Sequence, residues 1–287
     1  MKEQNYLDHL VGVFGHPVAE NPGAAIQEAA FRDLGLDLWR YLTIDIAPGE
    51  LEAAIQGLKA FHMRGVNCTI PHKVEVLKYL DEVAESARII GAVNTIINDG
   101  GRLTGENTDG KGFMISLESA GVDPAGKNIV ILGAGGAARA ISVELSLAGA
   151  KSIIIVNRPE DRAIGDKLHA LLRDTLKANA SYVDWSEPYK VPPETDILVN
   201  ATSVGLYPNI NDKPNLDYDT ITPRMFVQDV IPNPAFTPFL AEAKRRGAGW
   251  QTGMGMLINQ AALNIEMWTG LKPNKQVMTE AFEKAIA

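Results

Sequence analysis

The sequence is poor in cysteine and in long apolar runs. Its single cysteine is Cys68, so the chain cannot form an internal disulfide. No apolar run approaches the roughly 20 residues that a membrane-spanning helix needs, and residues 1–10 carry acids and lack the apolar core of a secretory signal peptide. Because disulfides persist in oxidising compartments, these absences predict a cytoplasmic protein with no membrane partner.

Positive charge is also scarce, with 27 lysines and arginines against 35 aspartates and glutamates and a net charge of −8. No cluster of basic residues is longer than Arg245-Arg246, so we expect no nucleic-acid partner. The five histidines lack the spacing of metal ligands, and we therefore expect no metal site. They are His9, His16, His62, His72 and His169.

The remaining composition, 46% hydrophobic and 22% charged, is that of a globular protein, and 287 residues suggest two domains. Strand-like apolar runs alternate with helical patterns, which predicts an α/β fold with mostly parallel sheets. Strands are expected at about residues 9–14, 39–46, 65–70, 92–97, 103–105, 129–132, 153–156, 196–200, 226–230 and 249–251. Helices are expected at about residues 23–34, 49–58, 81–89, 107–120, 136–148, 163–176, 239–246, 254–268 and 275–285, with Pro71 opening one more.

The clearest motif lies in residues 128–158. A strand-like run at 129–132 is followed by the sequence G-A-G-G-A-A, a helix and a second apolar run at 153–156. Glycines there allow a tight turn and a close approach of the backbone to a pyrophosphate, which the first N–H groups of the helix then bind. In a unit of about thirty residues this pattern predicts a Rossmann-like NAD(P)-binding domain; a turn without a ligand is the alternative. The cofactor residues predicted from it are Gly133, Gly135, Gly136 and Ala137.

Three further stretches, residues 67–73, 91–95 and 105–110, place polar side chains at predicted strand ends. Open α/β sheets bind ligands at such ends, so these stretches indicate a substrate site. Lys73 falls in the first turn of a predicted helix, where the helix dipole disfavours a cation. From spacing alone, Lys73 could still be a solvated lysine and Asp109 a helix-capping aspartate.

Together with residues 133–138, 200–205 (NATSVG) and 253–260 (GMGMLINQ), these stretches resemble the shikimate/quinate dehydrogenase family. The patterns N-x-T-x-P-x-K, G-A-V-N-T, N-T-D-G and G-x-x-M-L-x-x-Q carry the resemblance, which runs in order over about residues 12–269. It implies an oxidoreductase that uses NAD(P) to interconvert a ring secondary alcohol and a ketone.

The resemblance also implies roles for individual residues. Lys73 and Asp109 match the catalytic lysine and its paired aspartate, which would carry the hydroxyl proton while hydride passes to the nicotinamide. The substrate residues that it implies are Asn21, Asn67, Thr69, Asn94 and Gln260. The alternative for Gln260 is a structural role, as a buried amide whose hydrogen bonds are made within the protein. The further cofactor residues that it implies are Asn157, Arg158, Arg162, Thr202, Ser203, Val230 and Gly253.

The substrate loop departs from the family pattern G-x-P-x-x-H-S-x-S-P, whose two serines hold the substrate carboxylate. Here Asn21 and Gly23 stand at the serine positions, Glu20 replaces the histidine, and Pro232 replaces the tyrosine of D-x-V-Y-N-P. Only Thr69 remains of the carboxylate site, and each lost hydroxyl donor would cost about 1.5–3 kcal/mol. We therefore expect a small-molecule cyclic polyol, neutral or amino-bearing and less acidic than shikimate, as the substrate.

The choice of cofactor depends on the end of the strand at residues 153–156, which lacks the acid that binds the 2′-hydroxyl of NAD. Arg158 and Arg162 match arginines that hold the 2′-phosphate of NADP in the family, although Pro159, Glu160 and Asp161 count against phosphate binding. We expect NADP in preference to NAD. The alternative is that both arginines are solvated residues at the start of a helix and bind no phosphate.

We expect a substrate/catalytic domain of residues 1–110 plus 253–287 and a Rossmann NAD(P)-binding domain of residues 111–252, in a monomer or homodimer. The return of the C-terminal helices to the first domain is implied by the resemblance. A nucleotide-binding regulator that has lost catalysis is the alternative function. The presence of both Lys73 and Asp109 argues against it, because a sensor would not need the pair.

Overall fold

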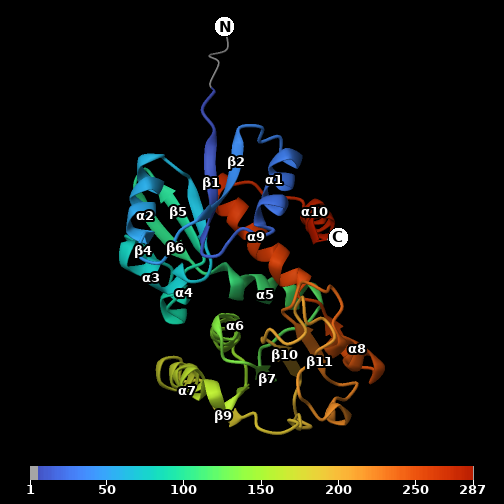
Figure 1. The fold of residues 1–287 in the computed structure, drawn as a ribbon. Coiled ribbons are helices and arrows are strands. Elements are labelled where there is room, and N and C mark those ends of the chain that lie inside the picture. The colour runs from blue at the N-terminus through green and yellow to red at the C-terminus, as the bar shows by residue number, and fades with distance from the viewer. Residues whose placement is uncertain (1–5, 287) are drawn as a thin grey trace. The chain divides into compact units, whose positions relative to one another are not determined.

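The computed structural model describes residues 6–286 and divides into two compact units. Within the described residues, unit 1 comprises residues 6–108 and 260–286, and unit 2 comprises residues 109–259. Each unit has one six-stranded sheet with helices packed against it (Figure 1). The predicted α/β class is confirmed.

The sheet of unit 1 has the order β2-β1-β3-β5-β6-β4, in which β5 runs antiparallel to β3 and β6 while the other neighbours are parallel. Its strands are β1 (His9–Gly15), β2 (Trp39–Asp45), β3 (Gly65–Cys68), β4 (Glu82–Val83), β5 (Thr95–Asp99) and β6 (Arg102–Glu106). Its helices are α1 (Gly23–Asp33), α2 (Leu51–Ala60), α3 (His72–Glu75), α4 (Glu85–Ile90) and α10 (Lys275–Ile286), with a 3-10 turn at Val76–Tyr79. Helix α9 (Met254–Thr269) begins in unit 2 and ends in unit 1.

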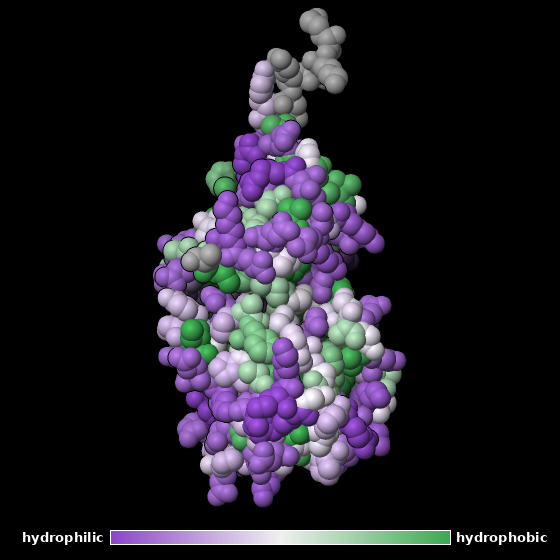
Figure 2. Space-filling model, turned by 90° about the vertical axis from the view of Figure 1, so that its right-hand side faces the viewer, coloured by the Kyte–Doolittle hydropathy of each residue, from purple (hydrophilic) through white to green (hydrophobic). Residues whose placement is uncertain are grey.

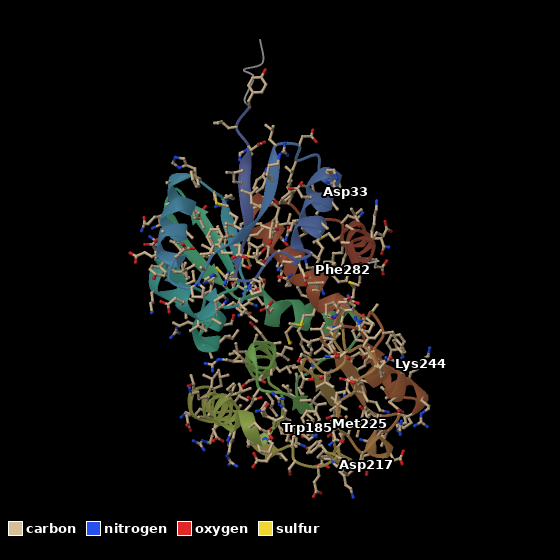
Figure 3. The ribbon with its side chains drawn as sticks, in the orientation of Figure 1. Asp33, Trp185, Asp217, Met225, Lys244 and Phe282 are labelled. Carbon is tan, nitrogen blue, oxygen red and sulfur yellow. The ribbon has the colours of Figure 1, made fainter. Side chains whose placement is uncertain are left out.

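The C-terminal helices contribute to the core of unit 1. Helix α10 packs on α1, and its buried Phe282 lies on the side of α1 (Figure 3). Trp268, near the end of α9, donates from Nε1 to the carbonyl oxygen of Ile96 at 3.0 Å. Gly65 lies at this contact, and a Cβ there would overlap both of these atoms. A glycine is therefore required where the indole rests on the sheet.

The sheet of unit 2 is entirely parallel, with the order β12-β11-β10-β7-β8-β9. This is the strand order of the Rossmann fold. Its strands are β7 (Asn128–Leu132), β8 (Ser152–Asn157), β9 (Ala180–Asp184), β10 (Ile197–Asn200), β11 (Phe226–Asp229) and β12 (Gly249–Gln251). Its helices are α5 (Thr108–Ser119), α6 (Gly136–Leu147), α7 (Arg162–Ala170, continued by a π-helical turn at Leu171–Thr175) and α8 (Pro238–Arg245), with 3-10 turns at Pro159–Asp161 and Tyr218–Thr220.

Both faces of this sheet are buried, which explains why its central strands are uninterrupted apolar runs. In β7, Ile129 and Ile131 belong to one core cluster, whereas Val130 and Leu132 belong to the cluster on the other face. Successive side chains of a strand point to opposite faces, so a strand covered on both sides must be apolar at every position.

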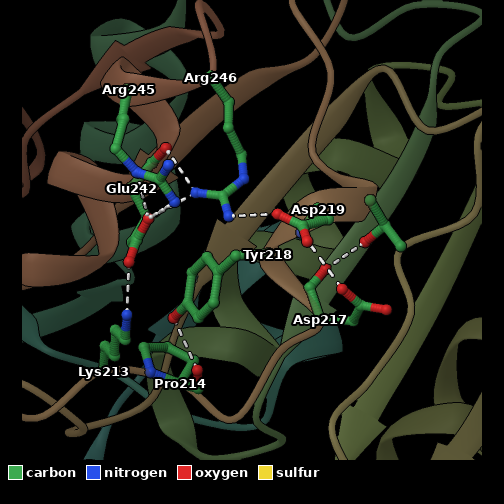
Figure 4. A network of polar contacts seen from close by, with 9 residues as sticks. Lys213, Pro214, Asp217, Tyr218, Asp219, Glu242, Arg245 and Arg246 are labelled. Atoms are coloured by element: carbon green, nitrogen blue, oxygen red, sulfur yellow. Dashed lines mark hydrogen bonds and ion pairs between the residues drawn. The ribbon is translucent and has the colours of Figure 1, made fainter.

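An ion-pair network fixes the loop between β10 and β11 against α8 (Figure 4). The carboxylate of Glu242 forms ion pairs with the ammonium of Lys213 and with a guanidinium nitrogen of Arg246, each at 2.5 Å. Arg246 also pairs with Asp219 at 2.8 Å. These contacts, led by the hydrogen bond from Lys213, lower the pKa of Glu242 to about 2. The loop is thereby tied to the helix at one end of unit 2.

No helix in residues 6–286 combines the length and the apolar character that crossing a membrane would require. Hydrophilic residues cover much of the molecular face drawn in Figure 2.

Replacing Gly65 by alanine should destabilise the protein by about 2–4 kcal/mol, because the new methyl group displaces Trp268 and breaks its hydrogen bond. Gly57→Ala is the matched control. Its Cβ would lie in helix α2 at 3.7 Å from the Phe61 ring, so it should stabilise the protein by up to about 1 kcal/mol. Urea unfolding of both variants measures the difference, and equal midpoints would show that the contact is dispensable.

Candidate active site

A buried polar network in unit 1 joins three of the expected substrate residues, Asn67, Asn94 and Gln260. Asn67 Nδ2 donates to the carbonyl oxygen of Asn94 and to Thr95 Oγ1, both at 3.1 Å. Thr95 Oγ1 donates to Asn264 Oδ1 at 2.8 Å, and Asn264 Nδ2 donates to Gln260 Oε1 at 3.2 Å. Residues from β3, β5 and α9 thus share one set of hydrogen bonds.

Sequence reasoning did not identify the residues that complete this network, Thr95, Thr108 and Asn264. Thr108 donates its backbone N–H to Asn94 Oδ1 at 2.8 Å and its hydroxyl to Asn264 Oδ1 at 3.0 Å. Asn94 Nδ2 donates in return to Thr108 Oγ1 at 3.0 Å. All three missed residues are fully buried. Thr95 and Thr108 belong to the G-A-V-N-T and N-T-D-G motifs, so these motifs could have indicated both residues.

The two expected proton-transfer residues, Lys73 and Asp109, are each half-buried and adjoin this network through the backbone. The carbonyl oxygen of Lys73 accepts from the N–H of Val93 at 2.8 Å, next to Asn94. Asp109 follows Thr108 directly, in the first turn of α5. The buried ring of His72 holds the short helix α3 in place, because its Nε2 bonds to the carbonyl oxygen of Ile46 at 2.7 Å.

The substrate loop is joined to Asn67 through Tyr41. Asn21 Oδ1 accepts from the N–H of Gly23 at 2.8 Å, and a Cβ on Gly23 would lie 2.7 Å from that oxygen and 3.3 Å from the Tyr41 hydroxyl. Tyr41 donates to Asn67 Oδ1 at 2.8 Å. Burial raises the pKa of Tyr41, which therefore stays protonated. The side chain of Thr69 adjoins Gly15, at the beginning of the same loop.

Two other side chains near this loop are buried. Gln27 lies one turn after Gly23 on α1; its Nε2 donates to the carbonyl oxygen of Ala261 at 3.4 Å, and its Oε1 has no partner within residues 6–286. Burial raises the pKa of the Cys68 thiol to about 12, so this cysteine is a structural residue of β3.

In unit 2, the carboxyl ends of β7 and β10 lie side by side where the strand order reverses, which is the ligand position of doubly wound sheets. Gly133 adopts a φ of +98° at the end of β7, and a Cβ there would lie 3.1 Å from the carbonyl oxygen of Ala201. By contrast, a Cβ on Gly135 or Gly136 would meet no protein atom within 4 Å. The fold does not require glycine at 135 and 136, whereas a closely approaching ligand would.

Helix α6 begins at Gly136 with Gly135 as its N-cap, and no side chain caps it. Its first turn carries no acidic residue, so its free N–H groups and dipole suit an anion. The residues present therefore fit the pyrophosphate of a dinucleotide, with Gly135, Gly136 and Ala137 as the residues that would hold it.

A second polar network fixes the loops after β10 and β11. Buried Asp229 accepts from Asn200 Nδ2 at 3.1 Å, from the N–H of Ile231 at 3.1 Å and from the Thr237 hydroxyl at 2.6 Å. Asn200 Oδ1 in turn accepts from the Thr202 hydroxyl at 2.7 Å. The expected cofactor residues of these loops are Thr202, Ser203 and Val230.

Gly253, another expected cofactor residue, belongs to the same region of unit 2. The backbone of Val230 and Ile231 lies so close to Gly253 that a Cβ there would overlap it. Asp229, which sequence reasoning did not identify, therefore organises the carboxyl edge of this sheet.

The expected 2′-phosphate residues lie at the end of β8. Asn157 Nδ2 donates to the carbonyl oxygen of Asp161 at 3.1 Å and holds the turn that carries Arg158. Arg158 and Arg162 are both exposed and paired with acids, Arg158 with Asp161 at 2.5 Å and Arg162 with Asp184 at 2.6 Å.

Comparison with known families gives three matches along the chain. Residues 13–96 match the shikimate dehydrogenase substrate binding domain, residues 117–214 match shikimate / quinate 5-dehydrogenase, and residues 253–281 match the shikimate 5′-dehydrogenase C-terminal domain.

Individual relatives are similar over nearly their whole length. The shikimate dehydrogenase (NADP(+)) of Desulforamulus reducens is 41% identical over 289 residues, which cover 99% of this chain and 97% of the relative. The ligand-free 5-ketofructose reductase of Gluconobacter sp. strain CHM43 is 46% identical, with a TM-score of 0.92. The match covers 98% of this chain and 99% of the reductase. Shikimate 5-dehydrogenase from Listeria monocytogenes, in complex with shikimate and NAD, is 33% identical, with a TM-score of 0.89. The match covers 98% of this chain and 99% of that dehydrogenase.

Asp229 should make stability depend on pH. Burial raises its pKa from an ordinary value of 3.8 to about 6, so the folded state holds a proton that the unfolded state releases. The contribution of Asp229 to the free energy of unfolding is therefore fully present below about pH 4. The free energy of unfolding falls by roughly 3 kcal/mol as the pH rises to about 6 and above. Asp229→Asn should lose this dependence. Urea unfolding between pH 4.5 and 7 measures it, and equal slopes in both proteins would contradict the assignment.

Proposed function

The chain belongs to the shikimate/quinate dehydrogenase family, and we propose that it interconverts a neutral polyhydroxylated ketone and its secondary alcohol with NADP(H). As a member of this family it is an NAD(P)-dependent oxidoreductase that acts on a secondary alcohol, and the relatives favour NADP. The neutral substrate is our own inference, and the arrangement of Asn21 and Gly23 is the observation that carries it.

Asn21 and Gly23 stand where the family has the two serines that hold a carboxylate. Gly23 offers no side-chain donor, and Asn21 Oδ1 already accepts from the Gly23 N–H. A serine at position 23 would bring its Cβ to 2.7 Å from Asn21 Oδ1, which is closer than real Cβ contacts come. Asn21 would have to turn aside and give up its hydrogen bond to the Gly23 N–H before a serine could fit, so the two replacements act together against an anionic substrate.

Two amide oxygens on this side of unit 1 can accept a further hydrogen bond. Asn67 uses both of its amide hydrogens on Asn94 and Thr95, so a ligand could meet only its oxygen, which already accepts one hydrogen bond from Tyr41. Gln27 Oε1 is likewise an acceptor that has no partner within residues 6–286. A carboxylate can only accept hydrogen bonds, whereas a hydroxyl both donates and accepts. These acceptors favour a polyol over a carboxylate.

The similarity to a 5-ketofructose reductase supports the same substrate class, because a ketofructose carries a ketone and hydroxyl groups but no carboxylate. We infer a keto-sugar or cyclic polyol of this kind. Shikimate, the ligand of the Listeria relative, is the comparison substrate.

The chemistry requires a hydride and a proton to move together. When bound, NADP(H) supplies or accepts the hydride. In the reduction, we assign the ammonium of Lys73 as the group that gives its proton to the carbonyl oxygen as that oxygen becomes a hydroxyl. The carboxylate of Asp109 stabilises the charged lysine, and in the oxidation the proton returns to Lys73. Asn94 and Gln260 orient the substrate hydroxyls.

We assign substrate binding to unit 1 and NADP binding to unit 2, with Gly133, Thr202, Ser203, Val230 and Gly253 as further cofactor residues. A cytoplasmic protein, monomeric or homodimeric, remains our prediction. The regulator is not favoured, because the relatives are named as dehydrogenases and a reductase.

Lys73→Ala should lower kcat by about 100- to 10,000-fold, because the proton donor is lost. The affinity for NADPH, measured by fluorescence titration, should stay within about twofold, since we assign NADP to unit 2. Lys78→Ala is the control, because Lys78 is exposed and pairs only with Glu75 among the described residues. A wild-type protein that binds NADPH but reduces none of 5-ketofructose, dehydroshikimate and uncharged keto-cyclitols would favour the regulator.

Restoring both serines should restore a carboxylate site. For shikimate, kcat/KM should rise about tenfold or more in Asn21→Ser/Gly23→Ser, because two hydroxyl donors return. Gly23→Ser alone should gain much less, because Asn21 Oδ1 blocks the new side chain. Turnover of the neutral substrate should fall in the double variant. Efficient oxidation of micromolar shikimate by the wild-type protein would refute the neutral substrate.

A further inference from the structure

The two arginines that follow β8 are held by neighbouring acids to very different degrees. From this difference we infer that Asp161 is a specificity-determining residue, which competes with the 2′-phosphate of NADP for Arg158 and narrows the preference for NADP over NAD. The inference rests on the proposed binding of NADP by unit 2, and it singles out Asp161 from the residues of this turn that the sequence analysis counted against phosphate binding.

Among residues 6–286, the guanidinium group of Arg158 has one ion-pair partner. Arg158 is the first residue after β8, its side chain is 69% exposed, and its Nη2 pairs with Asp161 Oδ2 at 2.5 Å across the turn at Pro159–Asp161. Asn157 Nδ2 holds the carbonyl oxygen of Asp161 at 3.1 Å. The backbone of Asp161 is therefore fixed, and its carboxylate is the group that Arg158 meets at the end of this strand.

Arg162, in contrast, contacts two carboxylates and an aromatic ring, although its side chain is 57% exposed. Its Nη1 pairs with Asp184 at 2.6 Å, its Nε lies 3.5 Å from Asp166, and its guanidinium group lies 5.6 Å from the centre of the Tyr182 ring. Tyr182 is itself pressed against Gly165, where a Cβ would overlap the ring. Arg162 would have to give up two carboxylates and a ring contact, whereas Arg158 gives up one exposed ion pair. Arg158 is thus the arginine that can turn to a phosphate.

The local charge opposes that phosphate. Four carboxylates, those of Glu160, Asp161, Asp166 and Asp184, accompany the two guanidinium groups of this region. A phosphate monoester brings a further charge of about −1.5 to −2. Of the four, Asp161 bears most directly on Arg158, because it occupies Nη2, one of the two donors that would bind a phosphate as a bidentate pair.

Asp161 has two opposing effects on phosphate binding. It orients Arg158, which favours binding, and it repels the phosphate and competes with it for Arg158, which opposes binding. An exposed ion pair fixes a long side chain only weakly. The repulsion between a carboxylate and a doubly charged phosphate bound to the same guanidinium acts over about 5 Å, which is within the Debye length at physiological salt. Repulsion and competition therefore outweigh orientation, and removing the charge of Asp161 should strengthen the binding of a 2′-phosphate.

The experiment uses the full chain and two nucleotides that differ only in the 2′-phosphate, 2′,5′-ADP and 5′-AMP, with affinities measured by calorimetry. Asp161→Asn should bind 2′,5′-ADP at least threefold more tightly and 5′-AMP unchanged, and the gain should shrink in high salt. Arg158→Gln should weaken 2′,5′-ADP at least tenfold without affecting 5′-AMP. Asp174→Asn is the matched control, since Asp174 pairs with exposed Arg173 at 2.7 Å elsewhere in unit 2 and should change neither affinity.

Unchanged or weaker binding of 2′,5′-ADP by Asp161→Asn would overturn the inference and make Asp161 an orienting residue. Equal losses for both nucleotides in Arg158→Gln would also overturn it, because Arg158 would then not discriminate the phosphate. No substrate is present, so the result is independent of the proposed neutral substrate. Failure of the wild-type protein to bind either nucleotide would instead contradict the cofactor assignment of the proposed function.

Discussion

The hydrogen bonds that join Asn94, Thr95, Thr108 and Asn264 are the constraint on which the site in unit 1 depends. All four side chains are buried, and each polar group left without a partner there would cost about 1–3 kcal/mol. They can satisfy one another only if the strand end at β5, the start of α5 and helix α9 meet in one arrangement. That arrangement also fixes the backbone beside Lys73 and the residue that precedes Asp109.

Unit 2 uses a comparable device at the carboxyl edge of its sheet. Asp229 is a buried carboxyl group that accepts from two loops, and Asn200 extends its hydrogen bonds to Thr202. Burial raises the pKa of Asp229, so the group that orders the edge of this sheet does so at some cost in stability near neutral pH. In both units, residues expected to touch ligands are held by buried residues whose own bonds are made within the protein.

Much of the fold could be predicted because its central strands are uninterrupted apolar runs bounded by glycine or polar residues. Two strands were missed for physical reasons. β4 has only Glu82 and Val83, and β9 is a half-exposed edge strand of mixed polarity, so neither shows a pattern before it pairs with a neighbour. The site itself stays a prediction. Motifs indicated Lys73 and Asn94, whereas Tyr41 and Asp229 carry no local signal, and their hydrogen bonds are evident only in the folded chain.

Residue types within short stretches were enough to predict the α/β class, the Rossmann-type glycine turn and the replacement of two family serines by Asn21 and Gly23. The folded chain was needed to show that a Cβ at position 23 would meet Asn21 Oδ1, that Asn67 has no amide hydrogen left for a ligand, and that Arg158 pairs with Asp161. The reason is that hydrogen-bond donors, acceptors and charges take their partners from space, and the sequence lists the groups without saying which of them are already engaged.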